Sequence, residues 1–203
     1  MIHITNVLYF NNDIDVRLCL KNGSITLQKA WALINQTSVS TTEQRHNIIT
    51  TEQDVLNPPF RLGSYRIAIK RNPIERFVST ITMMSSDTWT DRYMNSSWNK
   101  NLKELIDIND ISKTIENLKA NKIKDQHFMS QTHYMGKSSD YDKVYYLHEL
   151  PDLLKWLEKK TKTSTSISDL WENRTLSKHI NLTETEKLKI LNLYNMDCVN
   201  GWH

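Results

Sequence analysis

Two strand-like runs, each followed by a loop and then a helical pattern, constrain the fold of this chain more than any other feature. The first run covers residues 16–20, and the apolar residues Leu27, Ala30, Trp31 and Ile34 after it lie at helical spacing. The second run covers residues 65–69, and Pro73 fits the first turn of the helix that follows. Repeated strand-loop-helix units are typical of α/β proteins with a parallel sheet.

The later part of the chain continues this alternation. A third strand is expected at residues 144–147, and Pro151 fits the start of the next helix. Residues 102–118 predict one or two amphipathic helices, with Asp110 as a possible cap between them. A capping-box pattern beginning at Thr183 opens the last expected helix. The whole pattern predicts a mainly parallel sheet with helices on both faces.

The loop after the first strand has the residue types of an anion site. Backbone N–H groups at a helix N-terminus point toward an anion that lies there. Lys21 adds a cation, Gly23 lets the backbone approach closely, and Ser24 and Thr26 offer hydroxyl groups. Alone, such a loop is more typical of an ordinary turn after a strand, and only the second motif favours an anion site.

The loop after the second strand adds a second candidate phosphate site. The planar guanidinium of Arg71 can form paired, charge-assisted hydrogen bonds with a phosphate, and Ser79 adds a hydroxyl two turns along the helix. Arg76 is expected to support local packing or to pair with a carboxylate. Together, the two loops predict a site for a nucleotide that carries two phosphate groups.

These residues resemble the sulfotransferase family that uses 3′-phosphoadenosine-5′-phosphosulfate (PAPS), especially its carbohydrate-modifying branch. In that family a Lys-x-Gly-Ser-like loop holds the 5′-phosphosulfate, and an Arg with a Ser eight positions later holds the 3′-phosphate, the spacing of Arg71 and Ser79. Further segments that resemble the family follow in order: residues 125–128 (Asp-Gln-His-Phe), Gln131, residues 141–144, Glu149 with Leu150, residues 170–173, Tyr194 and Asp197.

The resemblance implies a P-loop-like three-layer sulfotransferase fold. It also implies transfer of the sulfuryl group from PAPS to a hydroxyl group, of a saccharide rather than of a phenol or peptide, which leaves adenosine 3′,5′-bisphosphate (PAP). No metal is expected to be needed. The residues expected to bind the nucleotide are Lys21, Asn22, Gly23, Ser24, Ile25, Thr26, Arg71 and Ser79.

Two catalytic residues are expected. Lys21 would stabilise the charge that develops on the leaving phosphate. His46 is the first candidate for the general base that activates the acceptor hydroxyl, because some carbohydrate sulfotransferases place a catalytic His between the two phosphate motifs. Glu43 and Glu52 lie in the same segment and are alternatives, since other branches of the family use Glu there.

Other functions leave weaker traces in the sequence. A P-loop kinase needs Gly-x-x-x-x-Gly-Lys-Ser/Thr, and the chain has none. A binding module for RNA or polyanionic glycans could use the six tryptophans and the basic excess, but the basic residues are dispersed. A catalytically inactive, sulfotransferase-like protein that binds nucleotide or polyanion remains an alternative.

Composition is consistent with a single enzyme domain spanning residues 1–203. The net charge of +3 favours anionic ligands without indicating a nucleic-acid partner. Two distant cysteines predict neither a disulfide framework nor a metal site. The sequence shows neither a signal peptide nor a run of the ~20 apolar residues that a membrane span needs. We therefore expect a cytoplasmic protein, of bacterial or viral origin, without a membrane partner.

Overall fold

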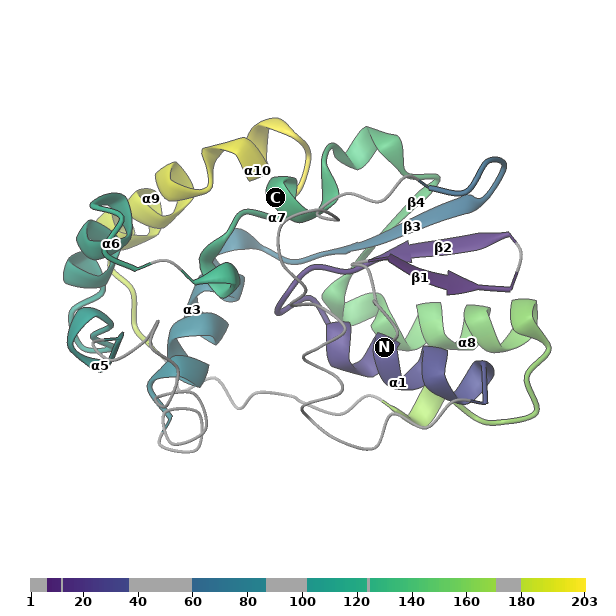
Figure 1. The fold of residues 1–203 in the computed structure, drawn as a ribbon. Coiled ribbons are helices and arrows are strands. Elements are labelled where there is room, and N and C mark those ends of the chain that lie inside the picture. Colours follow the sequence, from purple (N-terminus) through teal and green to yellow (C-terminus); the bar gives the residue numbers. More distant parts are fainter. Residues whose placement is uncertain (1–6, 12, 37–59, 87–101, 124, 171–179) are drawn as a thin grey trace.

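An open, mainly parallel sheet lies at the centre of the fold (Figure 1). The computed structural model describes residues 7–11, 13–36, 60–86, 102–123, 125–170 and 180–203. Within this part of the chain, four strands pair in the order β1-β2-β3-β4: Val7–Phe10 (β1), Ile14–Arg17 (β2), Tyr65–Lys70 (β3) and Lys143–Tyr146 (β4). β1 and β2 are antiparallel, while β2 with β3 and β3 with β4 are parallel. The predicted α/β class is confirmed.

Helices flank this sheet. The described α-helices are α1 (Ser24–Ile34), α3 (Pro73–Met84), α5 (Leu102–Leu105), α6 (Ile111–Lys119), α7 (Gln131–Met135), α8 (Leu150–Thr161), α9 (Glu184–Leu193) and α10 (Asn195–Val199). Short 3-10 turns lie at Gln126–Phe128 (η1), Ser138–Asp140 (η2), Leu147–Glu149 (η3) and Ser168–Leu170 (η4). None of the described helices is long and apolar enough to cross a membrane.

Side chains of β3 alternate between two hydrophobic clusters, because successive residues of a strand point to opposite faces of the sheet. Ile67 and Ile69 pack in one cluster with residues of α1 and α8. Figure 1 shows these two helices side by side along one face of the sheet. Ala68 packs in the other cluster with Tyr141 and Trp202. The middle of β3 is therefore covered on both faces of the sheet, whereas β4 at the edge is only half-buried.

A third hydrophobic cluster lies among helices α3, α5, α6 and α9. Figure 1 shows these helices beyond the end of the sheet. Its fully buried members include Phe77 and Ile81 of α3 and Ile190 of α9. This cluster holds α3 in place, and α3 follows directly after the second predicted phosphate loop.

Several local predictions are confirmed. Pro73 opens α3, and the Asn72 side chain caps that helix by accepting hydrogen bonds from the N–H groups of Ile74 and Glu75. Asp110 caps α6 through the N–H of Lys113. The capping box at the start of α9 is present, with Thr183 as its first residue.

Three elements differ clearly from the prediction: a strand was missed, a strand is displaced and a helix is divided. β1 was not expected. β2 is displaced toward the N-terminus from the predicted residues 16–20, since Leu18 to Leu20 are buried and apolar but lie beyond the paired ladder. The last predicted helix is divided at Tyr194, where α9 ends and α10 begins. Apolar runs report burial, and burial alone does not mark where strand pairing stops.

A buried carboxylate fixes the segment that leads into β3. Asp15 of β2 is fully buried and accepts hydrogen bonds from the backbone N–H of Arg61 at 2.8 Å, from its Nε at 2.6 Å and from Ser64 Oγ at 2.7 Å. A buried charge is tolerated only when it is paired and hydrogen-bonded. Asp15 therefore aligns the start of β3 with β2.

We predict that Asp15→Ala lowers the free energy of unfolding by ~3 kcal/mol, because it leaves buried donors without a partner. Urea denaturation measures this loss. Asp13→Ala is the matched control, since Asp13 is exposed two residues away, and it should change stability by less than ~0.5 kcal/mol. Equal, small effects of both substitutions would contradict the assigned role of Asp15.

Candidate functional site

The two predicted phosphate loops meet at the carboxyl edge of β2 and β3. Parallel pairing, which places Arg17 opposite Ala68, brings the ends of both strands to the same edge. Arg71 Nη1 donates to the backbone oxygen of Lys21 at 3.1 Å, and Asn22 Nδ2 donates to that of Ile69 at 2.7 Å. Each loop is thus hydrogen-bonded directly to the other.

The first loop contains two residues in the left-handed region of backbone conformation. Lys21 and Gly23 have φ angles of 69° and 78°, in the left-handed region. Gly23 is the N-cap of α1 and has no side chain with which to cap it. The first N–H groups of an α-helix lack intrahelical acceptors, so they are available to an anion. For Lys21, such a conformation costs ~1–3 kcal/mol, and strain of this kind gathers at functional sites.

The Lys21 side chain is largely withdrawn from solvent. Its Nζ lies 3.6 Å from the sulfur of Met83 on α3. Burial, and then the nearby Arg71 charge, lower the pKa of Lys21 to about 8. A cation with weakened hydration beside a second cation attracts anions strongly.

Arg71 lies in the loop just before Asn72, the N-cap of α3, and Ser79 lies within that helix. Burial lowers the pKa of Arg71. The carboxylate of Glu75, which lies 3.7 Å from Arg71 Nε, offsets part of this effect. Ser79 is only 1% exposed, and its hydroxyl has no hydrogen-bond partner among the described residues. An unsatisfied buried hydroxyl needs an explanation. A bound oxyanion would supply one only after the side chains that cover Ser79 move, because its hydroxyl has no exposed surface.

The side chain of Asn22 holds the two loops together. This side chain turns inward, donating to Ile69 O and at 2.7 Å to Gln131 Oε1, and the backbone N–H of Asn22 donates to Cys19 O at 3.2 Å. Asn22 therefore shapes the loop from within. Contact between Asn22 and a nucleotide stays a prediction, as does contact by the exposed Ile25.

Arg76 supports packing, as expected from the sequence. Its guanidinium is fully buried, donates to the backbone oxygens of His127 and Met129, and lies 4.9 Å from the ring centre of Tyr194. Burial alone would lower the pKa of Arg76. Nearby groups, of which Cys19 has the largest effect, outweigh burial and raise this pKa overall. Arg76 thus ties α3 to the turn that precedes α7.

The Asp-Gln-His-Phe segment is held by hydrogen bonds between two of its own residues, Asp125 and His127. Asp125 accepts hydrogen bonds from the backbone N–H and from Nδ1 of His127, at 2.8 and 2.7 Å. Burial would raise the pKa of Asp125, but the bonds from His127 outweigh this and lower it. The segment ends just before Gln131.

Gln131 is the residue that sequence reasoning left without a role. Its side chain is fully buried and is bonded to both predicted phosphate loops and to the backbone oxygen of Trp202. The only signal was its position behind the Asp-Gln-His-Phe segment. Such long-range bonds leave no periodic trace in a sequence.

The predicted general base lies outside the described residues. His46 and its alternatives, Glu43 and Glu52, all fall within residues 37–59. The assignment of the base stays a prediction. Among the described residues, no group of three or more His, Cys, Asp or Glu side chains could hold a metal ion, and Cys19 and Cys198 are both free.

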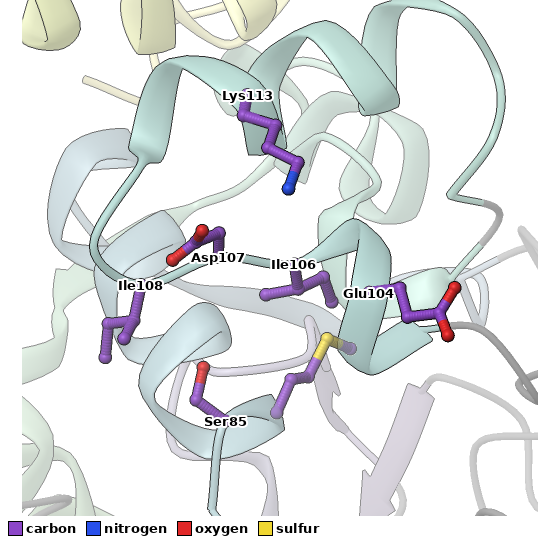
Figure 2. Close-up of a pocket in the computed structure, with 7 residues that line it drawn as sticks. Ser85, Glu104, Ile106, Asp107, Ile108 and Lys113 are labelled. Atoms are coloured by element: carbon purple, nitrogen blue, oxygen red, sulfur yellow. The ribbon is translucent and has the colours of Figure 1, made fainter.

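A cavity of about 460 Å³ lies apart from the predicted site residues, between the end of α3 and helices α5 and α6. Its lining is formed by Met84, Ser85, Glu104, Ile106, Asp107, Ile108 and Lys113. Figure 2 shows Lys113 extending from α6 into this space, whereas the carboxylate of Glu104 points away. None of the residues expected to bind the nucleotide lines it.

Comparisons with protein-family models, with curated proteins and with solved structures each found no match to this chain. Function is therefore inferred from the geometry of the two loops.

Two glycines provide a matched test of the first loop. A Cβ added to Gly23 would lie 2.8 Å from Leu150 Cδ2, whereas one added to Gly63, which has a similar φ of 76°, would meet no atom within 4 Å. We predict that Gly63→Ala costs ~1 kcal/mol of unfolding free energy from backbone strain alone. Gly23→Ala should cost ~1–3 kcal/mol more, because α8 crowds the new methyl group. Equal losses in denaturant titrations would contradict the close approach of Gly23 to α8.

Proposed function

We propose that this chain is a sulfotransferase that moves the sulfuryl group of PAPS to a hydroxyl group, on a carbohydrate, with PAP as the second product. The proposal extends to the fold, taking the α/β architecture as the P-loop-like three-layer fold of that family. One observation carries it: two loops with anion-binding residues, each at the end of a parallel strand, are hydrogen-bonded to one another at a single edge of the sheet.

The two loops would divide the nucleotide between them. The N-terminus of α1, with Lys21, Gly23, Ser24 and Thr26, would hold the 5′-phosphosulfate. Arg71 and Ser79 would hold the 3′-phosphate, and the buried, unpartnered Ser79 hydroxyl supports this role. Both groups are anionic, and both sites present cations from which water is partly excluded.

The chemistry follows from where charge develops. The bond between sulfur and the bridging oxygen of the 5′-phosphate breaks, and a bond forms between sulfur and the acceptor oxygen. The acceptor proton passes to a base, for which His46 is proposed, with Glu43 and Glu52 as alternatives. The leaving phosphate gains negative charge, and a protonated Lys21 together with fixed N–H groups would stabilise it.

Nucleotide binding gives the first test. By calorimetric titration, we predict that adenosine 3′,5′-bisphosphate binds more tightly than AMP or ATP, and that Arg71→Ala weakens its binding at least ~10-fold by removing a charge-assisted phosphate contact. Arg66→Ala is the matched control, because Arg66 lies on β3 near the end opposite to the Arg71 loop. A preference for ATP, or equal effects of the two substitutions, would sink the assignment of the 3′-phosphate site.

Lys21 gives a pH signature. Its pKa of about 8 means that it loses its proton as the pH rises through 8, so binding of the bisphosphate must then include proton uptake. We predict that affinity falls above pH 8, by up to ~10-fold per pH unit. Lys21→Arg should abolish this slope, since arginine stays protonated. A pH-independent wild type, or an unchanged slope in Lys21→Arg, would rule out Lys21 as the cation.

The lowered pKa also affects stability. Between pH 8 and 10.5 the unfolded state binds more protons at Lys21 than the folded state, so Lys21 destabilises the fold at neutral pH, and this effect disappears above pH 10.5. We predict that Lys21→Met raises the free energy of unfolding at pH 7 by roughly 1 kcal/mol after allowance for solvent screening. The same variant should lose sulfuryl transfer. A variant that retains full transfer would contradict the mechanism, and one that loses stability would contradict the burial of the charge.

A further inference from the structure

The side-chain amide of Gln131 uses all of its hydrogen-bonding capacity at the meeting point of the two loops. Its Oε1 accepts from Asn22 Nδ2 at 2.7 Å and from the backbone N–H of Arg71 at 2.9 Å. Its Nε2 donates to the backbone oxygens of Arg71 at 2.9 Å and of Trp202 at 3.1 Å. A glutamine has two acceptor sites on its oxygen and two N–H donors, and here each has a partner.

We propose that Gln131 is a positioning residue that sets the separation of the two phosphate loops, and so couples the binding of the 5′- and 3′-phosphate groups of one nucleotide. This inference rests on the proposed function. Gln131 bonds the Lys21 loop through Asn22. It bonds the Arg71 loop through both the backbone N–H and the backbone oxygen of Arg71. It touches neither phosphate and acts through these two residues.

The amide cannot be replaced by a side chain of similar size. Glutamate keeps the acceptor oxygens but, when ionised, has no donor for the carbonyls of Arg71 and Trp202. Methionine keeps the approximate volume and has neither strong donor nor strong acceptor. Because the site is fully buried, every partner that loses Gln131 loses a hydrogen bond that water does not readily replace.

Gln131 is itself held on two sides. The buried carboxylate of Asp197 accepts from the backbone N–H groups of Gln131 at 3.0 Å and of Thr132 at 2.8 Å. Upstream, Arg76 binds the backbone oxygens of His127 and Met129. These bonds make Gln131 a fixed reference point between the loops, which a role in spacing requires.

Fixed spacing matters only to a ligand that engages both loops. Once one phosphate is bound, the second binds at a high effective concentration if the loops are at the right separation. Each phosphate taken alone gains nothing from that separation. Loss of Gln131 should therefore reduce the affinity for a bisphosphate far more than the affinity for either monophosphate.

The test compares four ligands by calorimetry: adenosine, AMP, adenosine 3′-monophosphate and adenosine 3′,5′-bisphosphate. The coupling factor is the bisphosphate association constant times that of adenosine, divided by the product of the two monophosphate constants. We expect this factor to exceed one in the wild type and to fall at least ~10-fold in Gln131→Met, while each monophosphate constant changes less than ~3-fold. Gln126→Met is the matched control, because Gln126 is an exposed glutamine that lies close to Gln131 in the sequence. This substitution should leave the factor unchanged.

A second variant protects the test against poor folding of the first. Gln131→Glu retains the volume and the acceptor oxygens and should also lower the coupling factor. Asn22→Ala should lower the factor as well, because it removes both the bond to Gln131 and the direct bond to the backbone oxygen of Ile69.

The outcomes separate the two proposals. A coupling factor above one in the wild type that persists in both Gln131 variants overturns the role of Gln131 and leaves the proposed function standing. Parallel losses for all ligands overturn it too, because they indicate general damage to the site. A wild type that binds the bisphosphate no better than the monophosphates overturns the proposed function itself.

Discussion

The parallel pairing of β2 with β3 is the constraint on which the rest of this structure depends. Parallel strands end at the same edge of a sheet, so the loops that follow them become neighbours although they are about 50 residues apart in sequence. The pairing is fixed locally by Asp15, which holds the segment before β3, and beyond the strands by Gln131, which bonds both loops. A slip of one residue would exchange the faces of β3 and separate Lys21 from Arg71.

The conformation and burial of the candidate site lower the free energy of unfolding. Lys21 is strained at φ 69°, withdrawn from water and close to Arg71, and each of these features disfavours the folded state at neutral pH. Glu75 offsets the charge of Arg71 only in part, at 3.7 Å. An anion between the loops would relieve the repulsion between the two cations and satisfy the Ser79 hydroxyl. Such unfavourable contributions to stability are expected if the site binds a doubly anionic ligand, as we propose.

Sequence reasoning succeeded where the signal is local. The strand-loop-helix units, Pro73 at the start of α3 and the capping box at Thr183 follow from short-range preferences, and all are present. It failed where tertiary contacts decide. The end of the β2 ladder and the break at Tyr194 depend on contacts with β3 and α3, which are distant in the chain. The antiparallel β1 was missed although its partner, β2, is the next strand in the sequence. Gln131 and Asp197 drew attention only through resemblance, because their hydrogen bonds span 60 residues or more.

The most direct test of the central claim, that both loops bind one nucleotide, is a crystal structure of the protein with adenosine 3′,5′-bisphosphate. We predict that the 5′-phosphate lies at the N-terminus of α1 within hydrogen-bond reach of Lys21, and that the 3′-phosphate contacts Arg71 and Ser79. A nucleotide bound elsewhere, for instance in the cavity between α3 and α6, or bound with only one phosphate at this edge of the sheet, would contradict the account.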